Sequence, residues 1–254
     1  MKATLLAGAA LLLLTGSAFA ADLEVTAAGA PQVFSWTGCY GGGQAGGAFG
    51  QKTLTDSAGV LAPVTGFGSA NLAISGYMVG GQVGCDYQFA ANWVAGIEGA
   101  AAGGSIDGST GVAQPLAIPG DSATFKATTD MLTSVTARVG YARDRWLFYA
   151  KGGAAMASDK YSAIGTFLGT PYDLEGTESR WGWTAGAGIE WAFWHNWSLR
   201  LEYDYYGLGS RSVTLIDANT GNIGPENINQ TIQVVKVGLN LHVFATPAAA
   251  LPRW

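Results

Sequence analysis

The sequence predicts an all-β fold, an eight-stranded antiparallel up-and-down transmembrane β-barrel. Apolar residues alternate with small or polar residues in one segment after another, which is the period of a β-strand. The chain is 48% hydrophobic and only 12% charged. After the first 20 residues, however, it has no run of the roughly 18–20 apolar residues that a spanning helix needs. The connections between alternating segments are short and long in turn, as in a meander through a bilayer.

The first 20 residues have the features of a secretory signal: a basic residue at Lys2, an apolar run at 5–14 and the small-residue pattern Ala-Phe-Ala at 18–20. We therefore expect cleavage after Ala20 and export. The predicted parts are a signal peptide (1–20), a periplasmic N-terminal segment (21–35), an outer-membrane barrel (36–244) and a C-terminal extension (245–254). The net charge of −5 and the pI near 4.9 argue against a nucleic-acid partner.

Eight strands are expected along the chain. They are residues 36–50, 74–89, 93–104, 131–142, 146–157, 178–193, 197–208 and 230–244. The sixth shows the alternation most clearly, in WGWTAGAGIEW. Tight turns are expected at 90–92, 143–145 and 194–196, and long connections at 51–73, 105–130, 158–177 and 209–229. Such an arrangement places the tight turns in the periplasm and the long loops outside the cell.

Alternation alone leaves open which face points inward, because a soluble lipocalin-like barrel would bury its apolar face. Tryptophans beside the tight turns and at the chain start predict an aromatic girdle at one membrane interface. They are Trp36, Trp93, Trp146, Trp191, Trp194 and Trp197. Glycine and alanine crowd the charged face, which fits the inside of a narrow closed sheet. Since backbone groups in hydrocarbon must all be paired, exported apolar strands also imply a closed barrel. We therefore predict that the apolar face contacts lipid.

Charged residues of both signs follow the inward phase. The predicted interior polar cluster consists of Asp86, Glu98, Glu190, Glu202 and Asp204 with Arg138, Lys151, Arg180, Arg200 and Lys236. An eight-stranded barrel is just filled by its own side chains, and an unpaired ion inside it would cost several kcal/mol. We expect these groups to pair as a structural core. A selective constriction or a proton path is the functional alternative.

The first strand contains Gly41-x-Gly43-x-x-Gly46, the spacing of a dinucleotide-binding turn. That motif needs a buried strand before it, a helix after it and an acidic residue about 20 positions later, and none of these is visible. The glycines are better explained as thinning the barrel wall. Gln44 then faces the lumen, and Phe49 approaches the outer interface.

Cys39 and Cys85 both point to lipid on paired strands, each a few residues from its periplasmic end. Because the periplasm is oxidising and cross-strand neighbours have a suitable separation, the two cysteines could be directly opposite and bridged. A register shift of two residues would separate them. In that case they would be two unpaired apolar side chains.

Five stretches carry a family resemblance: WTGCYGGGQAGG, GGQVGCDYQFAANWVAGIEG, ARVGYARDRWLFYAKGGAA, GWTAGAGIEWAFWHNWSLRLEYDYYGLG and QVVKVGLNL. They resemble the small outer-membrane β-barrel proteins of alphaproteobacteria, the porin-family or outer-membrane immunogenic protein group. The resemblance covers nearly the whole mature chain and is most specific at 182–209. It implies an eight-stranded barrel in the outer membrane with surface loops and a mainly structural or surface-interaction role.

Residues that could carry chemistry are sparse. His195 lies in a tight turn and His242 near the end of the last strand, and no nucleophile-elbow motif occurs. Two cysteines and two histidines at wide spacing form no zinc pattern. We therefore predict no catalytic, cofactor-binding or metal-binding residues.

Three functions are compatible with these features. The first is an integral outer-membrane protein that anchors and stabilises the envelope and exposes its loops. The second is a narrow passive porin channel, and the third is a loop-mediated receptor or adhesin. The expected partners are outer-membrane lipid and lipopolysaccharide, with a surface ligand or another envelope protein as further candidates, and no nucleic acid.

Overall fold

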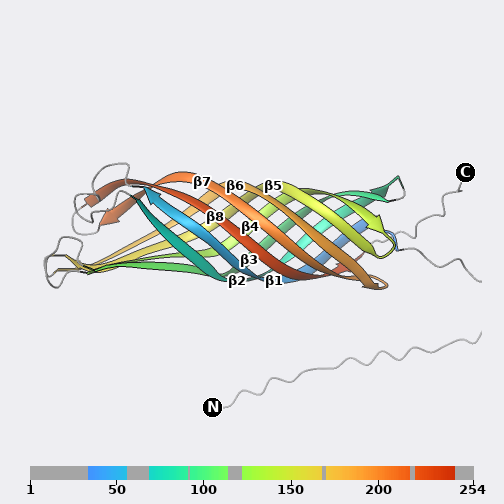
Figure 1. Ribbon diagram of the computed structural model, residues 1–254, viewed down its shortest axis with the longest axis horizontal. Helices are drawn as coiled ribbons and strands as arrows, with labels where there is room; N and C mark the ends of the chain where they lie inside the picture. Colours follow the sequence, from blue (N-terminus) through green and yellow to red (C-terminus); the bar gives the residue numbers. More distant parts are fainter. Residues whose placement is uncertain are drawn as a thin grey trace, which may run out of the picture. The chain divides into compact units, whose positions relative to one another are not determined.

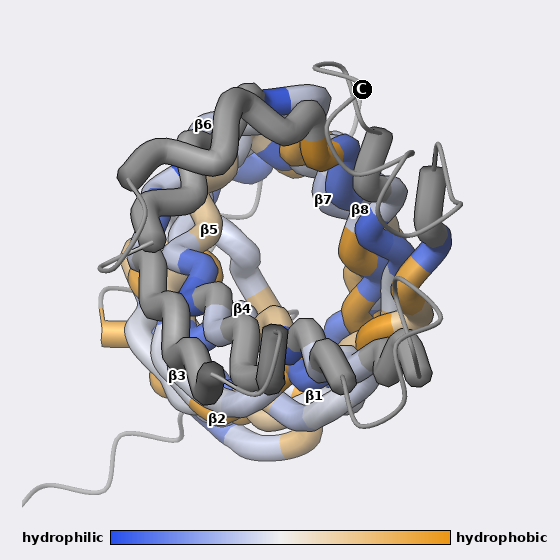
Figure 2. The backbone as a smooth tube through the Cα atoms, turned by 90° about the vertical axis from the view of Figure 1, so that its left-hand side faces the viewer, coloured by the Kyte–Doolittle hydropathy of each residue, from blue (hydrophilic) through white to orange (hydrophobic). Residues whose placement is uncertain are grey.

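The computed structural model describes residues 34–55, 69–90, 92–113, 122–167, 170–217 and 221–243. Eight strands form one closed antiparallel barrel in which each strand pairs with its neighbours in sequence and β1 pairs with β8 (Figures 1 and 2). The strands are β1 (Gly38–Thr55), β2 (Ser69–Phe89), β3 (Trp93–Ala113), β4 (Ser122–Arg143), β5 (Trp146–Phe167), β6 (Thr170–Trp194), β7 (Trp197–Asp217) and β8 (Gly221–His242). None of the described residues belongs to a helix with the length and hydropathy of a membrane span. The predicted signal peptide, most of the N-terminal segment and all of the C-terminal extension lie outside the described residues.

All eight expected strands are present, and their periplasmic ends agree with the prediction to within two residues. At their outer ends the strands extend further than predicted. β4 begins at Ser122 instead of 131, and β8 begins at Gly221 instead of 230. Alternation marks a strand only where one face is apolar and the other is polar. In the outer parts of the strands polar residues occur on both faces, as with the buried Lys52 and the exposed Lys160, whereas backbone pairing continues. Much of each predicted long loop is therefore a continuation of the sheet.

The three tight turns connect β2 to β3, β4 to β5 and β6 to β7. Two residues other than glycine adopt positive φ in these turns, Ala90 at 47° and Asp144 at 54°. The amide of Asn92 donates a 2.7 Å hydrogen bond to the carbonyl of Ala90 and closes the first turn. Asp tolerates the left-handed region well because its short side chain can bond the local backbone.

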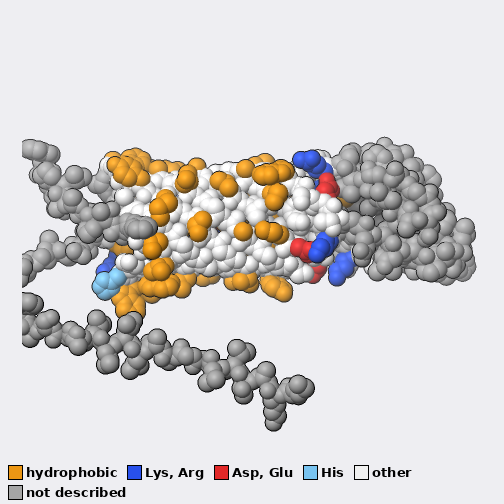
Figure 3. Space-filling view, turned by 180° about the vertical axis from the view of Figure 1, so that it is seen from behind, with side chains coloured by type: hydrophobic (Ala, Val, Ile, Leu, Met, Phe, Trp, Pro, Cys, Tyr) orange, Lys and Arg blue, Asp and Glu red, His pale blue; other side chains and the backbone are white. Residues whose placement is uncertain are grey.

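The two faces of the sheet are assigned as the alternation predicts. Ile189 is 40% exposed, whereas the adjacent Glu190 is fully buried. The same holds on β4, where Val135 is 69% exposed and the adjacent Thr136 is buried. Apolar side chains lie along the outer wall, and the charged side chains in view gather at its two ends (Figure 3). An apolar exterior around a polar interior is the reverse of a soluble barrel, so the wall faces lipid.

Glycines on the inward face of β1 allow the wall to close tightly. A Cβ built on Gly42 would lie 2.1 Å from the carbonyl oxygen of Leu239, and one on Gly46 would lie 2.3 Å from that of Val235. As expected, Gln44 points inward and is buried, while Phe49 points outward and is 44% exposed. The motif forms no phosphate cradle, because it lies inside a strand that continues to Thr55 instead of opening a helix at Gly46.

Candidate functional site: the closed barrel interior

A buried ion-pair network occupies the interior of the membrane-spanning part of the barrel. Its members are the carboxylates Asp86, Glu98, Glu190, Glu202 and Asp204 and the cations Arg138, Lys151, Arg200 and Lys236. They come from β2, β3, β4, β5, β6, β7 and β8, and none is more than 6% exposed. Alternation places each of these side chains inside, and closure of the sheet brings them together.

Arg138 on β4 is the centre of the periplasmic half of this network. Its guanidinium donates two hydrogen bonds to Asp86, from Nε at 2.7 Å and from a terminal nitrogen, and a third of 3.3 Å to Glu190. The guanidinium also lies 4.6 Å from the ring centre of Tyr40 and 5.1 Å from that of Tyr149. The planar guanidinium suits both kinds of contact, because it can bind a carboxylate through two nitrogens and stack on aromatic faces.

The lysines form the other half of the network. Lys151 lies 3.1 Å from Glu98 and 2.7 Å from Glu202, and Lys236 lies 2.8 Å from Glu202 and 2.7 Å from Asp204. Lys151 therefore bridges carboxylates from β3 and β7, and Lys236 bridges two carboxylates of β7. Multiple pairing offsets the cost of burying the ions, which would be several kcal/mol for each unpaired group.

Arg180, which was predicted to join this cluster, belongs to a second one nearer the outer end. Its Nε lies 3.1 Å from Asp159, and Lys52 lies 3.2 Å from the same carboxylate. Glu178 adds a 3.3 Å contact to Arg180. Lys52 and Asp159 were missed because the predicted strands ended at 50 and 157. Extending the inward phase of Gln44 and Lys151 by further pairs of residues would have found both.

An apolar layer separates the two charged clusters. On β5 the inward positions between Lys151 and Asp159 include the buried Ala155 and Ala157. On β8 Ile232 and Val234 lie between Gln230 and Lys236, and both are buried. The layer is completed by Ala48, Leu72, Ile74, Met78, Ile106, Ala127, Leu132, Tyr206 and Leu208. The interior is thus filled in layers of alternating polarity.

Trp36 was predicted to join the periplasmic girdle, and this was wrong. It is fully buried, and its ring lies 4.8 Å from that of Phe34 and 5.8 Å from that of His242. Its amide donates a 3.0 Å hydrogen bond to the side-chain carbonyl of Gln88. The residues just before β1 therefore turn into the periplasmic end of the barrel, where Trp36 packs against Leu147 and other buried apolar residues. The sequence places Trp36 next to the periplasmic end of β1, but this position alone does not show whether its ring points inward or outward.

The other five tryptophans of the predicted girdle do face outward. Trp93, Trp146, Trp191, Trp194 and Trp197 are between 38% and 62% exposed, and Trp146 stacks on Trp191 with ring centres 5.6 Å apart. A second outward aromatic group, which we had not predicted, lies about 11–13 positions further along the strands. It includes Tyr77, Trp181 and Trp183, which are between 54% and 64% exposed. Two outward aromatic girdles, one on each side of the apolar belt, mark the two membrane interfaces of a barrel.

Fluorescence quenching separates the buried tryptophan from the girdle. In vesicles containing brominated lipid, Trp93→Phe should remove a strongly quenched component of the emission, because Trp93 is 47% exposed on the lipid face. Trp36→Phe should remove a component that brominated lipid barely quenches. Equal quenching losses in the two variants would contradict the buried position of Trp36.

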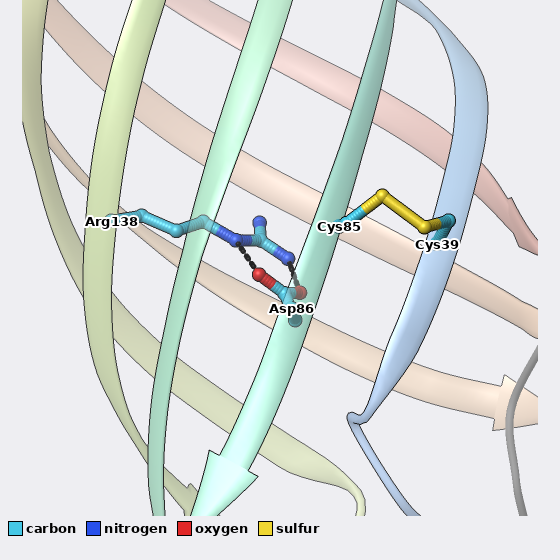
Figure 4. The surroundings of a disulfide bond; sticks show 4 residues. All are labelled: Cys39, Cys85, Asp86 and Arg138. Carbon is cyan, nitrogen blue, oxygen red and sulfur yellow. Dashed lines mark hydrogen bonds and ion pairs between the residues drawn. A yellow bond between two sulfur atoms is a disulfide. The ribbon is translucent and has the colours of Figure 1, made fainter.

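Cys39 and Cys85 are directly opposite in the β1–β2 register and are joined by a disulfide with an S–S distance of 2.06 Å. The bridge lies on the outer surface of the wall, whereas the next residue, Asp86, points inward to Arg138 (Figure 4). The two neighbouring positions thus serve opposite faces of the same strand.

Ser198, His242 and Glu190 meet at the periplasmic end of the network. The hydroxyl of Ser198 lies 2.9 Å from Nε2 of His242 and 2.5 Å from Glu190. In a hydrolase triad the imidazole stands between the hydroxyl and the carboxylate and uses a different nitrogen for each. Here the hydroxyl contacts both partners, and all three side chains are at most 2% exposed. The other histidine, His195, is exposed in the β6–β7 turn.

Beyond the second aromatic girdle the outer surface becomes polar. Asp107 accepts hydrogen bonds from Ser105 at 2.6 Å and Thr128 at 2.7 Å, and these bonds lower the pKa of its carboxyl. Lys160 forms a 2.7 Å ion pair with Asp130, which raises the pKa of the lysine. Solvated charges directly above an apolar belt mark the level at which the wall leaves the hydrocarbon.

A closed eight-stranded barrel with a lipid-facing apolar belt, two aromatic girdles and a polar interior defines the class of transmembrane β-barrel proteins. Comparison with known proteins specifies it further. Residues 7–241 match the family described as outer membrane protein beta-barrel domain, and the chain belongs to this family. The protein is therefore located in the outer membrane.

Curated relatives include the 31 kDa outer-membrane immunogenic proteins of Brucella melitensis biotype 1 and Brucella suis biovar 1. Each is 32% identical over 257 residues, which cover 94% of this chain and 99% of the relative. Among solved structures, the outer membrane protease OmpT from Escherichia coli is similar with a TM-score of 0.50 and 8% identity over 83% of this chain and 98% of that one. At this identity the likeness concerns the fold alone.

Proposed function

We propose that this protein is an envelope-stabilising and surface-exposed barrel whose lumen does not conduct ions. The observation that carries the proposal is the layered filling of the interior. From the periplasmic end outward, the described residues form an aromatic cluster, an ion-pair network, an apolar layer and a second ion cluster. Each layer draws side chains from several strands around the ring.

The packing of these layers supports a closed lumen. Between the ion-pair network and the apolar layer lies a cavity of about 20 Å³ bordered by Gln44, Ser134 and Lys236. Such a volume holds about one water molecule, which is too little for a hydrated ion to pass. A conducting barrel needs a continuous aqueous path, and porins obtain one with about 16–18 strands.

The same geometry favours a role without catalysis. Ser198 and His242 are buried in the barrel interior. A substrate would have to displace Phe34 and Trp36 to reach them from the periplasmic end, and the ion-pair network to reach them from the outer end. An acyl-transfer site would also need a free hydroxyl next to oxyanion donors. The hydroxyl of Ser198 instead donates one of the hydrogen bonds that the buried carboxylate of Glu190 accepts.

Exposure at the cell surface is supported by the fold and by the relatives. The Brucella proteins are called outer-membrane immunogenic proteins. In this chain the strands continue beyond the second girdle and carry solvated charges there. We therefore propose that the outer ends of the strands are antigenic, and that antibodies raised against a peptide from the outer end of β4, residues 122–130, bind intact cells.

Conductance measurements test the closed lumen. Purified protein reconstituted into planar bilayers should give no steady openings, because no hydrated path crosses the layers. Heat-modifiable migration of the same sample would show that the barrel is folded. Steady openings of a folded sample would favour the narrow-channel alternative and contradict the proposal.

A further inference from the structure

The strand that closes the barrel is unusually poor in side chains. From Gly41 to Gly50, six of the ten residues of β1 are glycine. Register in a sheet is set by side chains that pair across strands and by a hydrophobic pattern that only one alignment buries. A glycine-rich strand lacks most of this information and is prone to slip. β1 must nevertheless pair with β2 on one side and β8 on the other.

Correct assembly of the interior depends on the register of β1. Its inward side chains reach far around the ring: the hydroxyl of Tyr40 donates to Glu98 at 2.7 Å, and Gln44 accepts a 2.9 Å hydrogen bond from Arg200. A slip of one residue would turn both side chains toward lipid. A slip of two would move them by about 7 Å along the strand, since each residue advances about 3.3 Å. Either slip would leave buried ions without their partners.

The disulfide lies where it can prevent such slips. Cys39 is the second residue of β1, and its partner is the residue directly opposite in the β1–β2 register. One covalent bond at this point permits a single alignment of β1 on β2. With β1 held in this alignment on β2, its other edge can pair with β8 in one register only.

The surroundings of the disulfide indicate when it forms. Outward side chains near it are apolar and lipid-facing: Val83, Tyr87 and Ile97 are each about two thirds exposed. A water-soluble oxidant cannot reach sulfur atoms in this belt once the barrel is in the bilayer. The bond must therefore form while the chain is still in the oxidising periplasm.

We propose that the Cys39–Cys85 disulfide is an assembly device, formed on the β1–β2 hairpin before membrane insertion, that sets the register in which β1 closes on β8. In its formation the two thiols lose two protons and two electrons. A periplasmic protein disulfide accepts them by thiol–disulfide exchange and is released as a dithiol. The bond thus replaces the register information that the glycines of β1 lack.

Cross-links across the β1–β8 seam test the proposal. In the native register Ala45 is opposite Val237, and both face outward. Cysteines at 45 and 237 report this register, whereas cysteines at 45 and 235 report a slip of two residues. Each pair is built into the native protein and into a Cys39→Ala, Cys85→Ala variant. After refolding into vesicles the proteins are oxidised with membrane-permeant iodine, because these positions face lipid, and the cross-links are mapped by peptide mass. The ratio of slipped to native cross-links should rise several-fold in the alanine variant.

A second set of variants separates register from general stability. Outward Cβ atoms fit at Gly43 and Gly47, where the nearest atoms would be 3.8 Å and 4.0 Å away. Adding Gly43→Val and Gly47→Val to the alanine variant restores cross-strand side chains and should return the ratio toward its native value. An unchanged ratio after loss of the cysteines would overturn the proposal. So would oxidation of the reduced, inserted barrel by a water-soluble oxidant at the rate measured for the unfolded chain.

Discussion

Replacing Arg138 by Met is expected to lower the free energy of unfolding by about 3–5 kcal/mol, the cost of removing one partner from a buried ion pair. The substitution keeps most of the side-chain volume and removes the charge. Asp86 would lose two hydrogen bonds and Glu190 a third, and both carboxylates are buried. Urea unfolding in lipid vesicles, followed by tryptophan fluorescence, measures the change.

Two further variants control this experiment. Lys160 also forms an ion pair, with Asp130, but its side chain is 66% exposed, so Lys160→Met should leave the urea midpoint nearly unchanged. Combining Arg138→Met with Asp86→Leu removes one of the stranded carboxylates and should recover part of the loss. If the midpoint of the Arg138→Met variant equals that of the native protein, the ion network does not stabilise the barrel.

Replacing Gly46 by Ala is expected to cost about 3 kcal/mol or more, at the upper end of the range for overpacked sites. The added Cβ would lie 2.3 Å from the carbonyl oxygen of Val235 and 2.7 Å from Cβ of Lys236 on β8. Backbone atoms cannot move aside as a flexible side chain can. The seam between β1 and β8 would have to open.

The next residue provides a matched control. A Cβ on Gly47 would point outward, with the nearest atom, the carbonyl oxygen of Gly76, 4.0 Å away. Gly47→Ala should therefore change the free energy of unfolding by no more than about 0.5 kcal/mol. Heat-modifiable migration after refolding compares the two variants. A folded yield of Gly46→Ala equal to that of Gly47→Ala would show that the inward glycines are not needed for closure.

Local features of the chain predicted a large part of the fold. Alternation with period two identified eight strands and their sides, since Ile189 faces lipid and Glu190 faces the lumen. Short and long connections predicted an up-and-down meander, which the closed order from β1 to β8 confirms. These properties depend on neighbouring residues along one strand, so they can be derived without knowledge of the partners.

Other properties depend on how strands align with one another. The register of β5 on β6 and closure of the ring place Arg180 beside Asp159 instead of the central network. The direction of the chain before β1 buries Trp36, although its place in the sequence matched that of the lipid-facing tryptophans. The outer ends of the strands were missed because polar residues occur on both faces there, as with the buried Lys52 and the exposed Lys160, so that alternation fades.

The sequence by itself determined that the chain is an eight-stranded membrane barrel and which face of each strand is charged, because these follow from periodicity and from the need to pair every backbone group in hydrocarbon. Only the tertiary structure decided which charges pair, that two clusters are separated by an apolar layer, and that Phe34 and Trp36 occupy the periplasmic end. These contacts join residues far apart in the chain. They arise when the closing register of β1 brings all eight strands around one lumen.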